Sequence, residues 1–130
     1  MQDTPPAAAL DAQAPWLAPL RPLLPLLAQA DWPAALSREA ARRDVRTAAG
    51  LPVRFVPPQD AGATAYEAHI AATGRVPTRA RGAGALHDAG NALMWLTLPQ
   101  SKAALNARQA AELARAGVTA PRGVVRDAAT

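Results

Sequence analysis

In residues 86–109 the most apolar residues of the chain stand beside its most informative polar ones, and the spacing of the apolar positions over residues 86–116 predicts two helices. The first is expected over residues 86–98 and the second over residues 99–116, because helical periodicity continues on both sides of Pro99. Proline lacks an amide hydrogen and suits the first turn of a helix, so the second helix should begin there and meet the first at an angle. We expect this helix pair to form the centre of the fold.

Polar side chains share the apolar faces of both predicted helices. At about 100° per residue, Trp95 and Leu98 lie on the same arc of the first helix as three polar residues, and Leu105 and Leu113 share an arc of the second with three more. These six residues are His87, Asp88, Asn91, Lys102, Asn106 and Gln109. A solvated face does not usually carry Trp and Leu, so both polar sets are expected to point into the fold.

Shorter helices are predicted before this pair. Residues 15–30 are rich in leucine, but prolines divide them into short helical turns, which we expect to pack on the rest of the domain. Residues 31–47 predict a helix capped by Asp31. Residues 64–73 predict a helix that opens with a T-x-x-E capping box and ends at Gly74.

One segment, residues 51–56, has a β-like composition and is ended by two prolines. The sequence offers no second convincing strand, so we expect this segment to be extended without sheet pairing. Residues 75–85 contain the proline and glycines typical of a loop. The predicted fold class is therefore mainly α, a small helical domain with at most one short β-like segment.

The length of 130 residues allows one domain at most. We expect that domain over residues 15–120, with a flexible N-terminal tail at residues 1–14 and an extended C-terminal end at residues 121–130. These ends hold almost no large apolar side chains, so they cannot bury enough surface to offset the entropy of ordering. Aromatic residues make up only 4% of the chain, which predicts a thin core.

The amino-acid composition excludes some kinds of functional site and favours others. The chain has no cysteine, which excludes disulfides, thiolate metal sites and a cysteine nucleophile. Its formal net charge of +4 favours contact with anions or nucleic acid in a general way. Arg38, Arg42 and Arg46 recur every four residues and offer a stripe that could grip phosphates. A solvated face with interleaved acidic residues is the simpler interpretation of the same spacing.

The leucine-rich residues 15–30 raise the question of a signal peptide or a membrane span. No basic segment precedes them, prolines interrupt them, and they are too short to cross about 30 Å of hydrocarbon. We therefore expect a cytoplasmic protein with no membrane partner.

The inward polar set suits a pocket for a small polar or anionic ligand. His87, with an unperturbed pKa of about 6.5, suits general base work, Asp88 would orient it, and Lys102 would stabilise a developing negative charge. These three are the candidate catalytic residues. The candidate ligand-binding residues are Tyr66, Glu67, Arg79, Asn91 and Asn106. Arg79 precedes the first helix of the pair and is expected to face Asp88 if its loop folds back.

The sequence leaves the ligand, any cofactor and the existence of an activity open. It contains no serine elbow, no glycine-rich phosphate loop before a helix and no H-E-x-x-H pair, and we predict no metal site. Two alternatives stand beside the pocket. The polar residues would form a structural network that satisfies buried backbone groups, or the arginines would make the chain a nucleic-acid-binding module.

The residues from Tyr66 onward resemble a known family. The segment YEAHIAATGRVPTR is followed by HD, by NALMWLTLP, by a lysine three residues on and by LN. This combination resembles the bacterial domain of unknown function 3025 family over about residues 16–127, most specifically over residues 66–106. The shared positions are Tyr66, Glu67, Gly74, Thr78, Arg79, His87, Asp88, Asn91, Trp95, Pro99, Lys102 and Asn106. The resemblance implies no activity.

Two features depart from the family pattern. Ala89 and Gly90 stand where the family usually carries two aromatic residues, which removes burial worth several kcal/mol and places a glycine inside a helix. The resemblance also implies a further C-terminal half after Asp127. We therefore expect a shortened member, in which the missing half would hold a partner for residues 51–56.

Overall fold

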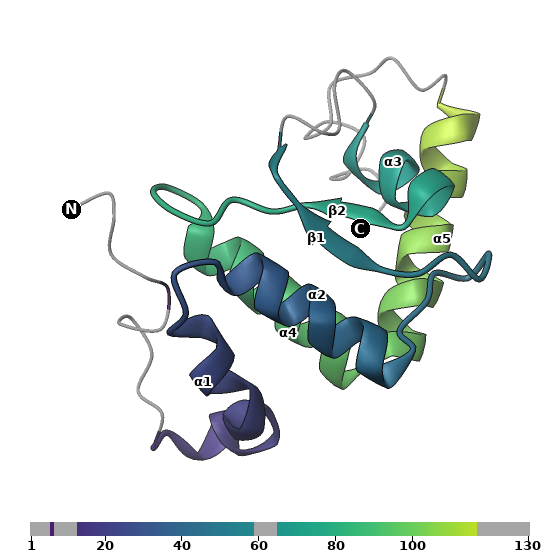
Figure 1. Cartoon of the computed structure of the whole chain (residues 1–130). Helices are drawn as coiled ribbons and strands as arrows, with labels where there is room; N and C mark the ends of the chain where they lie inside the picture. Colours follow the sequence, from purple (N-terminus) through teal and green to yellow (C-terminus); the bar gives the residue numbers. More distant parts are fainter. Residues whose placement is uncertain (1–5, 7–12, 59–64, 117–130) are drawn as a thin grey trace.

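Helices account for most of residues 6, 13–58 and 65–116, the part of the chain that the computed structural model describes (Figure 1). The elements in chain order are the 3-10 helix η2 (Pro15–Leu23), α1 (Leu24–Leu27), α2 (Trp32–Arg43), β1 (Arg54–Val56), α3 (Tyr66–Thr73), β2 (Arg75–Pro77), α4 (Ala85–Thr97) and α5 (Pro99–Arg115). The predicted mainly α fold class is confirmed. The C-terminal end predicted at residues 121–130 lies outside the described residues, as does nearly all of the N-terminal tail predicted at 1–14.

The central helix pair is present, and its break lies where proline predicts it. Leu98 is both the C-cap of α4 and the N-cap of α5, and its φ of −128° and ψ of 61° lie outside helical values. Its amide donates to the carbonyl of Met94 at 2.8 Å, and its carbonyl accepts from the amide of Lys102 at 3.0 Å. The two helices therefore meet at a corner, and at that corner the Leu98 side chain is exposed rather than inward as its arc predicted.

The prediction that residues 51–56 lack a strand partner is wrong. β1 pairs in parallel with β2, with Phe55 opposite Val76 and Val56 opposite Pro77. Three residues are too few to show the alternation that identifies a strand in sequence, and Pro77 looks like a loop residue. Adjacent residues of a strand direct their amide positions to opposite sides, so the missing amide of Pro77 faces away from β1 and costs no ladder hydrogen bond.

The other edge of β1 is covered by a side chain of α2. The Phe55 amide donates to Ser37 Oγ at 2.8 Å, and Ser37 Oγ donates to the Phe55 carbonyl at 3.3 Å. α2 lies against β1, and α4 lies beside α2 (Figure 1). Ser37 thus makes the hydrogen bonds that a third strand would make, so the amide and carbonyl of Phe55 on this edge of β1 are not left unpaired.

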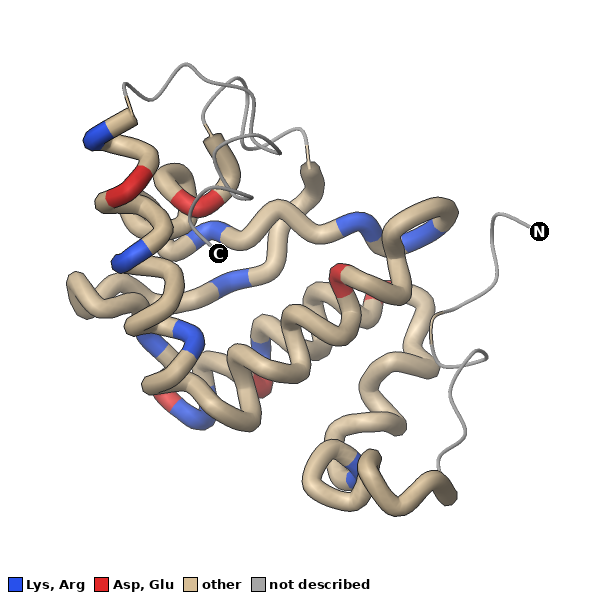
Figure 2. Tube along the Cα trace, turned by 180° about the vertical axis from the view of Figure 1, so that it is seen from behind, with Lys and Arg blue, Asp and Glu red and all other residues tan. Residues whose placement is uncertain are grey.

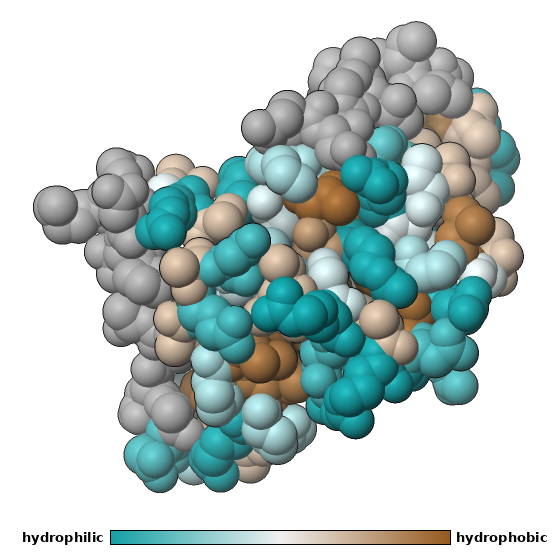
Figure 3. All heavy atoms as spheres, in the orientation of Figure 1, coloured by the Kyte–Doolittle hydropathy of each residue, from teal (hydrophilic) through white to brown (hydrophobic). Residues whose placement is uncertain are grey.

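The core lies where α2, α4 and the two strands meet. Its largest fully buried side chains are Trp32, Trp95, Leu27, Leu36, Ile70, Leu113, Val53 and Val76. The indole of Trp32 donates to the carbonyl of Ala80 at 2.9 Å, which holds the segment after β2 against the start of α2. Much of the surface in Figure 3 is hydrophilic, and apolar atoms show in separate patches.

The leucine-rich N-terminal segment behaves as predicted apart from its tryptophan. η2 and α1 are short helical turns that bury Leu23, Leu24 and Leu27 against the rest of the chain. Trp16, expected to pack with them, is 78% exposed. No helix in the described part of the chain has both the length and the hydropathy needed to span a membrane.

Two predicted helix boundaries are wrong. α2 begins with the predicted Asp31 cap, which accepts from the amide of Ala34 at 3.3 Å, but it ends at Arg43 because Asp44 adopts the left-handed conformation. α3 begins after Ala65, one residue later than the capping box requires, and no side chain caps it. Gly74 ends α3 in the left-handed conformation, as predicted.

Ser37→Ala tests the edge cover of β1. Removing the hydroxyl leaves the buried amide and carbonyl of Phe55 without their partner, so the free energy of unfolding should fall by about 1–2 kcal/mol in urea denaturation. Arg38→Ala, an exposed change on the same helix, is the control and should stay within about 0.5 kcal/mol of the parent. Equal effects of both variants would show that Ser37 does not stabilise the strand edge.

The hydrogen bonds of the Glu39 carboxylate should make the stability of the fold depend on pH. Glu39 accepts from Nε of Arg42 at 3.1 Å and of Arg43 at 2.7 Å, and these hydrogen bonds lower the pKa of its carboxyl group from 4.5 to about 2. Because the folded pKa lies below the unfolded one, the stabilisation is complete above about pH 4.5 and is lost as the pH falls toward about 2.

Glu39→Gln should therefore lower the free energy of unfolding by about 0.5–1 kcal/mol near pH 7, a modest value because the arginines are solvated. Urea denaturation of both proteins at about pH 7 and about pH 2 measures the difference. A difference of the same size at both pH values would contradict the role of the ionised carboxylate.

Candidate functional site

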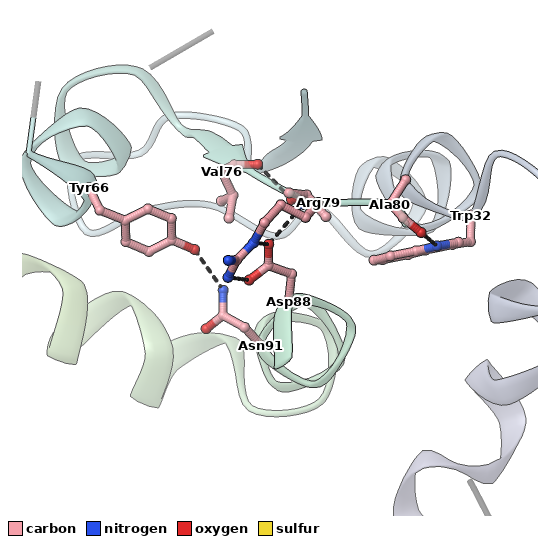
Figure 4. Close-up of polar contacts among 8 residues, drawn as sticks. Trp32, Tyr66, Val76, Arg79, Ala80, Asp88 and Asn91 are labelled. Atoms are coloured by element: carbon pink, nitrogen blue, oxygen red, sulfur yellow. Dashed lines mark hydrogen bonds and ion pairs between the residues drawn. The ribbon is translucent and has the colours of Figure 1, made fainter. Parts of the chain in front are cut away.

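Three helices bring Tyr66, Asn91 and Lys102 together. The Asn91 side chain on α4 donates through Nδ2 to the Tyr66 hydroxyl on α3 at 3.1 Å, and its Oδ1 accepts a hydrogen bond from Lys102 Nζ on α5. Figure 4 shows the tyrosine and the asparagine pointing toward each other across the gap between their helices. All three side chains are half-buried, so the group that we call the Tyr66–Asn91–Lys102 cluster is anchored in the fold and still reaches solvent.

The indole of Trp95 lies beneath this cluster. Lys102 Nζ lies 5.6 Å from the centre of the Trp95 ring, a distance at which the ammonium is attracted to the negative face of the ring. Trp95 is 1% exposed, and its Nε1 has no hydrogen-bond partner among the described residues. A buried indole N–H without an acceptor is uncommon, because its desolvation is uncompensated.

Glu67 and Asn106 form the deepest polar pair. Asn106 Nδ2 donates to the Glu67 carbonyl at 3.0 Å and to Glu67 Oε1 at 2.9 Å, and both residues are buried. Asn106 Oδ1 has no partner in the described part of the chain. The carboxylate predicted to cap α3 therefore binds α5 instead, since α3 begins one residue late.

Arg79 and Asp88 pair as the sequence predicts for a loop that folds back. Asp88 Oδ2 accepts from the amide and from Nε of Arg79, each at 2.8 Å, and Oδ1 accepts from Nη2 at 3.0 Å. The side-chain hydrogen bonds to Asp88 raise the pKa of the Arg79 guanidinium above its usual value, so the guanidinium stays charged. In Figure 4 the guanidinium lies beside Asn91 and near the Tyr66 ring, so the ion pair borders the cluster.

Glycine at position 84 makes room for this ion pair. It has φ +91°, and a Cβ atom there would lie 2.2 Å from Arg79 Cζ and 2.3 Å from Nη1. The guanidinium therefore lies directly on the backbone of the turn before α4, an approach that other residues would block.

His87 does not belong to the cluster, and the prediction that it points inward is wrong. Its side chain is exposed, while the next residue, Asp88, is buried. One step along a helix turns about 100°, so the inward arc of α4 begins at Asp88 and continues through Asn91 and Trp95. Among the described residues no hydrogen bond joins His87 to the cluster.

On α5 the inward arc is also narrower than predicted. Lys102, Asn106, Gln109 and Leu113 form one stripe, whose members are buried or half-buried. Leu105 was placed on the same arc but is 47% exposed. α3 packs along the stripe, which explains why the polar residues are covered while a leucine is not.

A comparison with known protein families places the chain. The model of a family described as protein of unknown function (DUF3025) matches residues 53–130, which is more than half of the sequence. The chain belongs to the DUF3025 family. No curated protein and no solved structure matches it. The match begins at Val53, not near Trp16 as the resemblance indicated, and it includes every residue of the cluster and of the Glu67–Asn106 and Arg79–Asp88 pairs.

The arginine stripe predicted in this DUF3025 chain is largely neutralised. Arg42 pairs with Glu39, and Arg46 pairs with Asp44 at 2.8 Å and also donates to the Gly50 carbonyl. Arg46 lies beyond the end of α2, so the stripe does not continue on one helix. Figure 2 shows basic and acidic positions interspersed over the described chain rather than gathered on one face.

Two hollows on the surface were not predicted from the sequence. One, of about 360 Å³, lies between the start of α2 and the ends of the strands, and the other, of about 520 Å³, lies between residues 43–48 and the start of α5. Neither is lined by a residue of the cluster. No three His, Asp or Glu side chains in the described residues are grouped to hold a metal ion.

Gly84→Ala tests the close approach of Arg79. The new methyl group would displace the guanidinium from Asp88 and add left-handed strain, which together should lower the free energy of unfolding by about 2–4 kcal/mol in urea denaturation.

Gly50→Ala is the matched control, because Gly50 also has a positive φ, +87°, but nothing within 4 Å of its Cβ position. Its free energy of unfolding should fall by only about 1–2 kcal/mol, from the left-handed strain alone. Equal losses in the two variants would show that the Arg79–Asp88 pair does not depend on the glycine.

Proposed function

We propose that this DUF3025 protein binds a small anionic ligand at the Tyr66–Asn91–Lys102 cluster. The proposal depends on one observation: a half-buried ammonium group, Lys102 Nζ, is held in place by the side-chain amide of Asn91 and by the ring of Trp95. An ammonium group is a strong hydrogen-bond donor to carboxylate and phosphate oxygens. A ligand carboxylate or phosphate arriving from solvent would therefore meet a cation whose position is already fixed.

Preorganisation supports this proposal. A free lysine side chain loses rotamer entropy when it binds a ligand, and this loss lowers affinity. Here the asparagine and the tryptophan have already restricted Lys102, and Tyr66 restricts the asparagine. Part of the entropic cost is thus met by folding, which favours binding.

The neighbouring charges also favour an anion. Asp88 is occupied by three hydrogen bonds from Arg79, and Glu67 is turned into the fold toward Asn106. The Arg79 side chain is still 43% exposed and borders Asn91, so a second cation lies at the edge of the cluster. A ligand anion placed near Lys102 would be attracted to both.

We propose binding rather than turnover. General base chemistry near neutral pH would call for a group such as His87, whose side chain lies outside the cluster. The remaining members are a phenol, an amide and an ammonium, which suit recognition of an oxyanion by hydrogen bonds.

Titration of the full chain with sodium acetate and with inorganic phosphate, followed by amide and side-chain NMR, tests the proposal. Saturable shifts of the Asn91 side-chain NH₂ signals are expected, and Lys102→Met should weaken binding at least about tenfold because it removes the charge at similar length. Thermal unfolding of the variant checks that the fold persists.

Arg108→Met is the matched control, since it removes an exposed charge from the same helix. It should leave the affinity within about twofold, as expected for a distant, solvated charge. Similar losses in both variants, or the absence of saturation in the parent protein, would overturn the proposal.

A further inference from the structure

The hollow of about 360 Å³ lies at the ends of the two parallel strands. β1 ends at Val56 and β2 at Pro77, and the residues that follow each strand form part of the wall. The lining includes Asp31, Phe55, Pro57, Pro58, Thr78 and Ala80. Parallel strands that stop together leave a crevice beyond their carboxyl ends, which is where open α/β sheets bind ligands. The volume falls in the range of small-molecule sites, about 300–1,000 Å³.

The wall of this crevice is apolar except at two residues. Thr78 is buried, and its polar groups are engaged: its amide donates to the Val56 carbonyl and its hydroxyl to the Val76 carbonyl, each at 2.7 Å. Asp31 is exposed at the rim and is the one charged side chain among the described residues of the lining. A molecule in the crevice would therefore have an apolar body and meet a single carboxylate.

The helix start at the rim does not reverse this charge. The amino end of a helix acts as roughly half a positive charge, and Asp31 caps α2 by accepting the Ala34 amide at 3.3 Å. A full negative charge placed there leaves the rim negative. The anion that a helix start would attract is thus already supplied by the chain, so the crevice favours a cation.

We infer that this crevice binds a small organic amine, with an aromatic or aliphatic body against Phe55 and the prolines and its ammonium group beside Asp31. This site is independent of the anion cluster. Arg79 points toward Asp88 at the border of the cluster, whereas its neighbours Thr78 and Ala80 line the crevice. The two sites therefore differ in charge and in ligand class.

Three probes with the same aromatic body and different end groups test this inference. Phenethylamine, 2-phenylethanol and phenylacetate are titrated separately into the full chain, with the Trp32 indole and the Thr78 and Ala80 amides followed by NMR. Trp32 reports on the crevice because its indole donates to the Ala80 carbonyl. The amine should saturate these shifts and bind at least about fivefold more tightly than the alcohol, with phenylacetate the weakest.

Asp31→Asn removes the charge and keeps the helix cap, since asparagine caps helices as well as aspartate. In this variant the amine should lose its advantage over the alcohol. Asp44→Asn is the control, because Asp44 is an exposed acid outside the crevice in a left-handed conformation that asparagine also adopts. It should leave the order of affinities unchanged.

The possible outcomes separate clearly. Equal affinity for the three probes in the parent protein would overturn the preference for an amine, and the absence of saturable shifts at the crevice would overturn the site itself. An amine preference that survives in Asp31→Asn would show that the carboxylate does not recognise the ligand. Phenylacetate shifts at Asn91 follow from the proposed function and leave this inference intact, whereas phenethylamine shifts confined to Asn91 would contradict it.

Discussion

The side-chain amide of Asn91 is the interaction on which the arrangement of the three C-terminal helices depends. It donates to Tyr66 on α3 and accepts from Lys102 on α5, so a single residue of α4 connects both neighbours. An unsatisfied polar group in this position would cost about 1–3 kcal/mol, a large fraction of the stability of a small domain. The corner at Pro99 makes the contact possible, because a straight helix would carry Lys102 away from Asn91.

Elements outside the family match contribute to the same core. The match begins at Val53, yet Ser37 of α2 covers the edge of β1 and Trp32 holds the segment after β2. Arg43 of α2 also donates to the Leu96 carbonyl on α4 at 3.3 Å. α2 therefore satisfies polar backbone groups in three places as well as burying apolar surface, and the strand pair depends on it because two short strands alone are unstable.

Residues 78–80 separate two chemically different surfaces. The guanidinium of Arg79 meets Asp88 and borders the Tyr66–Asn91–Lys102 cluster, while Thr78 and Ala80 face the crevice beside Asp31. Successive side chains of an extended segment point to opposite sides, which explains how three residues serve both. One side of this segment carries cations held by hydrogen bonds, and the other carries apolar surface with one carboxylate.

The sequence by itself determined the helix pair and its break at Pro99, because periodicity and proline chemistry act over short separations, and it predicted the Arg79–Asp88 pairing for a loop that folds back. Only the tertiary structure decided that β1 pairs with β2, that Glu67 binds Asn106 rather than its own helix end, and that His87 lies outside. A helical arc predicts which residues share a face, but burial depends on where a neighbouring helix packs. A three-residue strand acquires its identity from its partner, since so short a segment has no periodicity of its own.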